Sequence, residues 1–137
     1  MGLILDSSVL IAGERRRESV RQIIQRVHCI HGDQESALSV ISIIELTHGI
    51  YRARTDSDRT MRRIFTEELV RDMIIHPVYL PIAQLAGKIE GEQASRGISI
   101  AMEDLIIGAT ALHLGFDVLT LNVRHFQAIA GLNVLTL

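Results

Sequence analysis

Near its start the chain reads Leu3-Ile4-Leu5-Asp6-Ser7-Ser8, three apolar residues that end at a carboxylate and two hydroxyls. Apolar residues followed by side chains that turn a chain or cap a helix predict a short buried strand over residues 3–5. A carboxylate beside an apolar segment must be solvated by a cap, a partner or a metal ion. Asp6 is therefore the first candidate functional residue.

Short apolar strands alternate with helices along the rest of the chain. Further strands are predicted over roughly residues 37–40, 73–78, 118–121 and 134–137. Helices are predicted over roughly residues 14–28, 42–53, 59–72, 81–95, 102–114 and 124–129. The connections are too long for hairpins, so the pattern predicts an α/β domain with a parallel sheet. From the length of 137 residues we expect one domain over residues 1–137.

The composition fits a sheet that is covered on both faces. Hydrophobic residues make up 47% of the chain, but aromatic residues only 4%, and Trp is absent. The core must then consist of Ile, Leu, Val and Ala, the usual filling of buried parallel sheets. Cys29 is the only cysteine, so no intramolecular disulfide forms, which fits a reducing cytoplasm. No apolar segment approaches 18 residues, and we expect no membrane anchor.

The charged residues give no simple indication of a partner. The net charge of −2 provides no overall field that favours nucleic acid. Arginine outnumbers lysine thirteen to one, which is typical both of phosphate binding and of skewed genomic base composition. Two arginine groups flank candidate motifs, namely Arg15-Arg16-Arg17 and the set Arg52, Arg54, Arg59, Arg62 and Arg63. Each could engage phosphates, but nearby acids balance both groups, so we interpret them as solvated faces.

Two further carboxylates lie in apolar surroundings. Glu45 interrupts the segment that begins at residue 40, and Asp104 opens the apolar stretch that follows it. Each acid, like Asp6, could simply be a helix cap or a first-turn carboxylate. Helical spacing weakens this alternative, because Asp104 shares a face with Gly108 and Glu45 shares one with Gly49. We therefore expect both acids to point toward packed structure, and Glu103 to be the solvated neighbour of Asp104.

The candidate residues lie where a parallel sheet binds ligands, beyond the carboxyl ends of its strands at the point where strand order reverses. Asp6 ends the first predicted strand and Asn122 directly follows the fourth. Glu45 and Asp104 lie near the starts of helices that can surround such a crevice. If the acids converge, their like charges repel, and a divalent cation is the natural remedy.

Four motifs carry these residues in order along the chain. They are Asp6-Ser7-Ser8, Ser42-Ile43-Ile44-Glu45-Leu46, Asp104-Leu105-Ile106-Ile107-Gly108-Ala109-Thr110-Ala111 and Thr120-Leu121-Asn122-Val123-Arg124-His125-Phe126. Their order and spacing resemble those of PIN-domain ribonucleases, and the match is closest to VapC-type toxins of bacterial toxin–antitoxin pairs. Each motif alone has little specificity, but four in order over essentially the whole chain are specific.

The resemblance implies a three-layer α/β/α sandwich around a short, mainly parallel sheet. It also implies an endoribonuclease that uses Mg²⁺, or Mn²⁺ in its place, held by Asp6, Glu45 and Asp104. Asn122 belongs to the same catalytic set but is neutral where relatives often carry an acid. Its amide oxygen can still contact a metal or a bound water, and the number of metal ions stays open.

Further expectations concern the partners. Ser8 and Thr120 are candidates for positioning the substrate or for hydrogen bonds to the acids. The resemblance implies an RNA substrate, a cognate antitoxin protein that inhibits the enzyme, a homodimer and a cytoplasmic location. By the same resemblance, hydrolysis would leave a 5′-phosphate and a 3′-hydroxyl.

Two other interpretations stay open. The neutral Asn122 is also compatible with a non-catalytic PIN-like module that binds RNA or a protein. The same acids could serve a metal phosphatase or a DNA nuclease. The chain has no Walker sequence and no G-x-G-x-x-G, which argues against a nucleotide-binding domain. Ser8 stands where a haloacid-dehalogenase-like phosphatase would need a second aspartate.

Overall fold

The computed structural model describes residues 1–137. Its centre is a five-stranded sheet of strand order β3-β2-β1-β4-β5, in which every pair is parallel. The strands are β1 (Gly2–Leu5), β2 (Glu35–Ser39), β3 (Ile74–His76), β4 (Asp117–Leu119) and β5 (Val134–Leu135). The parallel sheet predicted from the alternating pattern is confirmed.

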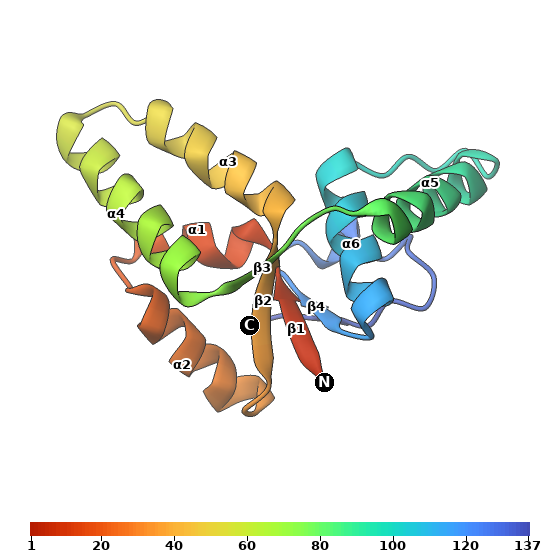
Figure 1. Ribbon diagram of the computed structural model, residues 1–137, viewed down its shortest axis with the longest axis horizontal. Coiled ribbons are helices and arrows are strands. Elements are labelled where there is room, and N and C mark those ends of the chain that lie inside the picture. The colour runs from red at the N-terminus through yellow and green to blue at the C-terminus, as the bar shows by residue number, and fades with distance from the viewer.

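Helices cover the sheet on both faces (Figure 1). One face carries α1 (Ser7–Arg15), α2 (Val20–His31), α3 (Val40–Tyr51) and α4 (Asp56–Asp72). The other face carries α5 (Leu80–Ala94) and α6 (Met102–Leu114), and a 3₁₀ turn, η1 (Val123–His125), follows β4. This arrangement is the three-layer α/β/α sandwich that we expected.

Strand β1 shows how the two halves of the core form. Successive side chains of a strand point to opposite faces, so Leu3 and Leu5 pack with α1–α4 while Ile4 packs with α5 and α6. All three side chains are fully buried. Burial of a side chain of this size stabilises the fold by about 1.5–3 kcal/mol. A strand that is apolar on both faces is therefore fixed at the centre of the sheet.

The strand order reverses beside β1. From β1 the chain passes to β2 and then to the edge strand β3, and it returns on the other side of β1 as β4 and β5. In the β1–β4 pair, Leu5 lies opposite Leu119. The carboxyl ends of these two strands thus flank the switch point at which open α/β sheets bind ligands.

The prediction of a single helix over residues 14–28 is wrong. The chain forms α1 and α2 instead, with a break at residues 16–19. Arg17 takes a left-handed backbone conformation with φ 63°, and Ser19 begins α2 through a reciprocal capping box with Gln22. The cap satisfies N–H groups at the start of α2 that would otherwise lack partners, and this makes a separate second helix favourable.

Apart from the helix predicted over residues 124–129, the other elements differ from the prediction only at their ends. Helix α6 matches the predicted residues 102–114, whereas the helix predicted over 124–129 is only the short turn η1. The strands predicted near 118–121 and 134–137 are also shorter than expected. None of the helices combines the length and the apolarity that crossing a bilayer requires.

Candidate active site

Five of the six predicted site residues line one hollow beyond the carboxyl ends of β1 and β4. They are Asp6, Ser8, Glu45, Asp104 and Asn122, and the hollow is completed by Ser7, Ala101, Glu103 and His125. The sixth residue, Thr120, is fully buried and donates a hydrogen bond to Asp6. Segments that are distant in the sequence therefore meet at this edge of the sheet.

Asp6 is held in a fixed orientation at the end of β1. Its backbone N–H donates to the carbonyl of Leu119 at 2.9 Å. Its Oδ2 accepts hydrogen bonds from Ser8 Oγ at 2.7 Å and from Thr120 Oγ1 at 2.8 Å. The carboxylate makes no capping bond to α1, so the interpretation of Asp6 as a simple helix cap is wrong. Its Oδ1 accepts no hydrogen bond and is open to another partner.

The two hydroxyls that hold Asp6 are themselves held by the loop after β4. Ser8 Oγ accepts from the N–H of Leu121 at 3.1 Å, and Thr120 Oγ1 accepts from the N–H of Asn122 at 2.9 Å. Both hydroxyls thus donate to the acid and accept from the backbone. Of the two roles expected for Ser8 and Thr120, the structure shows hydrogen bonds to the acid. Asn122 lines the hollow with an exposed side chain.

Glu45 reaches the hollow from the middle of α3. The first turn of this helix contains no acid, so the interpretation of Glu45 as a first-turn carboxylate is wrong. Its Oε2 accepts a short hydrogen bond of 2.5 Å from Ser7 Oγ. Ser7, which the sequence analysis did not single out, therefore orients the second acid much as Ser8 orients the first.

Asp104 lies in the first turn of α6, so the alternative interpretation of it as a first-turn carboxylate is correct as far as position goes. Its carboxylate also faces the hollow. Only 14% of its side chain is exposed, and its Oδ2 lies 3.3 Å from His125 Nδ1. The pKa of Asp104 is raised above its ordinary value, and burial is the largest cause. His125 lowers this pKa, whereas the negative charges of Asp6 and Glu45 raise it further. The site thus carries negative charge that the protein does not fully neutralise.

Glu103 is a fourth acid at the hollow. It is exposed, as expected for the solvated neighbour of Asp104, yet its side chain lines the same hollow. Partial burial raises the pKa of Glu103, followed by the adjacent carboxylate of Glu45 and then by Asp104 and Asp6. Sequence spacing placed Glu103 about 100° away from Asp104 on the helix, and it gave no sign that α3 would approach this side of α6.

The donor set suits a divalent cation. Four carboxylates line the hollow and no Lys or Arg does, and carboxylate oxygens are the ligands that Mg²⁺ and related hard ions prefer. The open Oδ1 of Asp6 and the raised pKa of Asp104 both fit such an ion. No three acidic, imidazole or thiol groups stand close enough together to enclose an ion in this arrangement. An ion held by only one or two of these carboxylates would complete its coordination shell with water.

Fold and site together define a class: a parallel α/β domain whose central strands end in a cluster of carboxylates. Residues 3–132 match the family described as PIN domain. The chain is 34% identical over 136 residues to Ribonuclease VapC1 of Rickettsia felis, and the match covers 99% of this chain and 96% of that protein. The chain belongs to the PIN-domain family and, within it, to the VapC group.

Solved structures share the fold over the full length. VapBC2 from Rickettsia felis, crystallised bound to a DNA fragment from its promoter, superimposes with a TM-score of 0.84 at 16% identity, over 100% of this chain and 99% of that one. VapBC-1 from nontypeable Haemophilus influenzae gives a TM-score of 0.79 at 25% identity, over 98% and 96%. The five-stranded sheet and its flanking helices are thus the shared framework of this group.

Proposed function

We propose that this chain is a metal-dependent endoribonuclease that acts in the cytoplasm as the toxin of a toxin–antitoxin pair. The observation that carries the proposal is the meeting of Asp6, Glu45 and Asp104, from three separate segments, in one hollow at the switch point of the sheet. The name of the relative from Rickettsia felis, a ribonuclease, supports RNA as the substrate.

In this proposal Asp6 and Asp104 would hold Mg²⁺ or Mn²⁺ directly, and Glu45 would act through a bound water. The chemistry that a bound ion would supply is orientation of the scissile phosphate, stabilisation of charge on its oxygens and a lower pKa for an attacking water. The hydroxyls of Ser8 and Thr120 keep Asp6 turned toward the hollow. Ser7 holds Glu45 Oε2, which leaves Oε1 to orient the water or to take its proton.

Asn122 contributes a neutral amide at the edge of the same hollow. We assign it to the catalytic set as a group that contacts a metal-bound water or the substrate through its amide oxygen. With a neutral residue there, the site has one charge fewer with which to hold a second cation.

The partners belong to the same proposal. The Haemophilus relative was solved as a VapBC assembly, which supports a cognate antitoxin for this chain as well. We also propose that the chain forms a homodimer. Size-exclusion chromatography with light scattering tests this directly, because a dimer elutes with twice the mass of one chain.

The function is tested by incubating RNA with purified protein in Mg²⁺, in Mn²⁺ and in EDTA. Cleavage should require a metal and should be abolished in Asp6→Asn and Asp104→Asn. Asp117→Asn is a matched control, because Asp117 begins β4 at the end of the sheet opposite the hollow. Cleavage at the wild-type rate by the Asp6 and Asp104 variants would overturn the assignment.

A second candidate is favoured by one observation, the neutral Asn122 at the hollow. This second candidate is a PIN-like module that binds RNA or a protein and does not cleave RNA. RNA affinity that persists without any cleavage in Mn²⁺ would select it. Parallel assays with single-stranded DNA and with small phosphate esters decide whether the acids serve a DNA nuclease or a phosphatase instead.

A further inference from the structure

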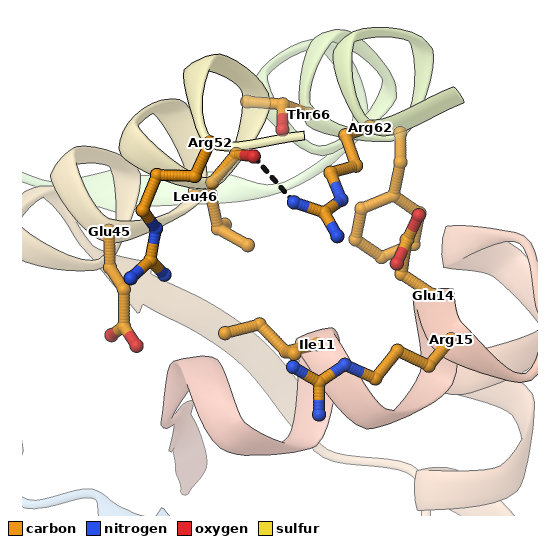
Figure 2. A pocket seen from close by; sticks show the side chains of 10 residues that line it. Ile11, Glu14, Arg15, Glu45, Leu46, Arg52, Arg62 and Thr66 are labelled. Atoms are coloured by element: carbon orange, nitrogen blue, oxygen red, sulfur yellow. Dashed lines mark hydrogen bonds between the residues drawn. The ribbon is translucent and has the colours of Figure 1, made fainter. Parts of the chain in front are cut away.

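A second hollow adjoins the acidic one, between α1, α3 and α4 (Figure 2). It is lined by ten residues, and three of them are arginines: Arg15 from α1, Arg52 from the end of α3 and Arg62 from α4. Glu45 lines both hollows, so the two adjoin at its side chain. A hollow that carries three arginines thus lies beside the acidic site.

None of these three arginines forms an ion pair with a carboxylate. Arg16 pairs with Glu18 and Arg59 pairs with Asp56, which agrees with the solvated faces expected from the sequence. Arg15, Arg52 and Arg62 form no ion pair, although Glu14 and Glu45 line the same hollow. Arg15 and Arg52 are exposed and Arg62 is partly buried, so the expectation of a solvated face is met, but none of the three is neutralised by a direct carboxylate partner.

Their placement explains why they stand open. Arg15 lies in the last turn of α1 and Arg52 caps α3, where the helix dipole favours a positive charge without any side-chain partner. Arg62 is braced by a hydrogen bond of 2.6 Å from Nη1 to the carbonyl of Gly49, and this bond leaves its other nitrogens free. Figure 2 shows the three guanidinium groups arranged around the hollow.

We propose that the arginine subsite, defined as Arg15, Arg52 and Arg62, binds a backbone phosphate of the RNA next to the phosphate at the acidic centre. This inference rests on the proposed ribonuclease function. Guanidinium groups bind phosphate oxygens through paired, charge-assisted hydrogen bonds. A chain of net charge −2 with four acids at its site repels a polyanion, and the adjoining subsite offsets that repulsion locally.

The arginine subsite also defines a path for the bound RNA strand. Because the two hollows adjoin at Glu45, one phosphate lies at the acids while its neighbour lies at the arginines. The RNA strand then crosses α3, from the carboxyl ends of β1 and β4 toward α4. The arginines act as binding and positioning residues, and their removal should raise KM and leave kcat nearly unchanged.

The test measures binding of a fluorescein-labelled single-stranded RNA by anisotropy in EDTA, over a series of salt concentrations. The double variant Arg15→Gln/Arg52→Gln should bind about tenfold more weakly than wild type. The slope of log affinity against log salt should fall by about 0.7 for each lost contact. Arg63→Gln is the matched control, since Arg63 follows Arg62 on α4, is exposed and does not line the hollow.

The result that overturns the subsite is a double variant that matches Arg63→Gln in affinity, salt slope and KM. Loss of binding to a co-expressed partner protein with unchanged RNA binding would overturn it too, in favour of a protein site. If the double variant fails to fold, Arg15→Lys/Arg52→Lys replaces it; this pair should keep the salt slope and lose affinity, and unchanged affinity would overturn the subsite.

Failure of the subsite and failure of the nuclease are distinguishable. A wild-type protein that binds RNA in EDTA through these arginines but never cleaves it would contradict the nuclease and leave the subsite standing. A protein that cleaves RNA, with arginine variants equal to the control, would contradict the subsite alone.

Discussion

Asp6 shows how one carboxylate of the site is fixed in orientation. Its Oδ2 is engaged by the hydroxyls of Ser8 and Thr120, and its Oδ1 is open. The acid cannot turn away without breaking bonds that the loop after β4 also fixes. A ligand oriented in this way loses little side-chain freedom when it binds.

Asn122 is where the site departs most from a cluster of acids. Asn122→Asp adds a negative charge at the hollow, so the metal concentration that gives half-maximal RNA cleavage should fall roughly tenfold. A titration of cleavage rate against Mg²⁺ measures this. Asp33, exposed at the far end of α2, supplies a charge-changing control, Asp33→Asn, that should leave the metal requirement unaltered. An unchanged requirement in Asn122→Asp would place Asn122 outside the metal's reach.

Asp104 should make the metal-free fold less stable near neutral pH. Its folded-state pKa is raised above the ordinary 3.8, chiefly by burial. A raised pKa in the folded state means that ionisation is more costly there than in the unfolded chain, and the cost vanishes as the pH falls. In EDTA, Asp104→Asn should therefore unfold at a higher temperature than wild type at neutral pH, with a difference that shrinks toward about pH 4.

Thermal unfolding followed by circular dichroism measures this difference, with Asp117→Asn as the control acid. A midpoint for Asp104→Asn that is equal to or below that of wild type would show that the protein itself neutralises the acid. The prediction would then be wrong, and the case for a cation at this position would weaken.

Asp6, Glu45 and Asp104 could be singled out from the sequence because a carboxylate in an apolar segment needs an explanation. Ser7 and Glu103 could not, because a hydroxyl and an exposed acid near helix starts have ordinary structural uses. Their approach to Glu45 depends on how α3 and α6 pack across the switch point. That packing depends on tertiary geometry, and the hydrophobic periodicity of the sequence does not predict it.

At the scale of the elements, α6 and the α1–α2 pair show what local pattern decides. Helix α6 ends at Gly115, which has φ 69°, and this left-handed glycine was readable in advance as the end of the helix. The break between α1 and α2 contains neither Gly nor Pro; it depends on the left-handed Arg17 and on the cap at Ser19. The Ser19-x-x-Gln22 spacing before an apolar segment was a readable helix start that the sequence analysis missed, whereas the left-handed Arg17 had no signal in the sequence.

The Ser19 cap gives a prediction for this element. Ser19→Ala removes the hydroxyl that accepts from the N–H of Gln22, and it should lower the free energy of unfolding by about 1 kcal/mol. Urea denaturation measures the loss. Ser57→Ala is the control, because Ser57 lies exposed near the start of α4, where Thr55 supplies the cap. RNA cleavage should be unchanged in both, and equal stabilities would show that the cap contributes nothing.

At the scale of the whole molecule, topology creates the site. The alternation of strands and helices predicted a parallel sheet but not its strand order, which is β3-β2-β1-β4-β5 with β1 at the centre. That order brings the ends of β1 and β4 together and sets α3 and α6 beside them. Like charges then gather in one hollow, at a cost in stability that a bound cation would offset.

The most direct measurement is a calorimetric titration of metal-free protein with Mn²⁺. Wild type and Asp117→Asn should bind with equal affinity at or below millimolar metal, whereas Asp6→Asn and Asp104→Asn should bind at least about tenfold more weakly. Equal affinities for all four proteins, or no binding by wild type at millimolar Mn²⁺, would contradict a shared cation between these carboxylates.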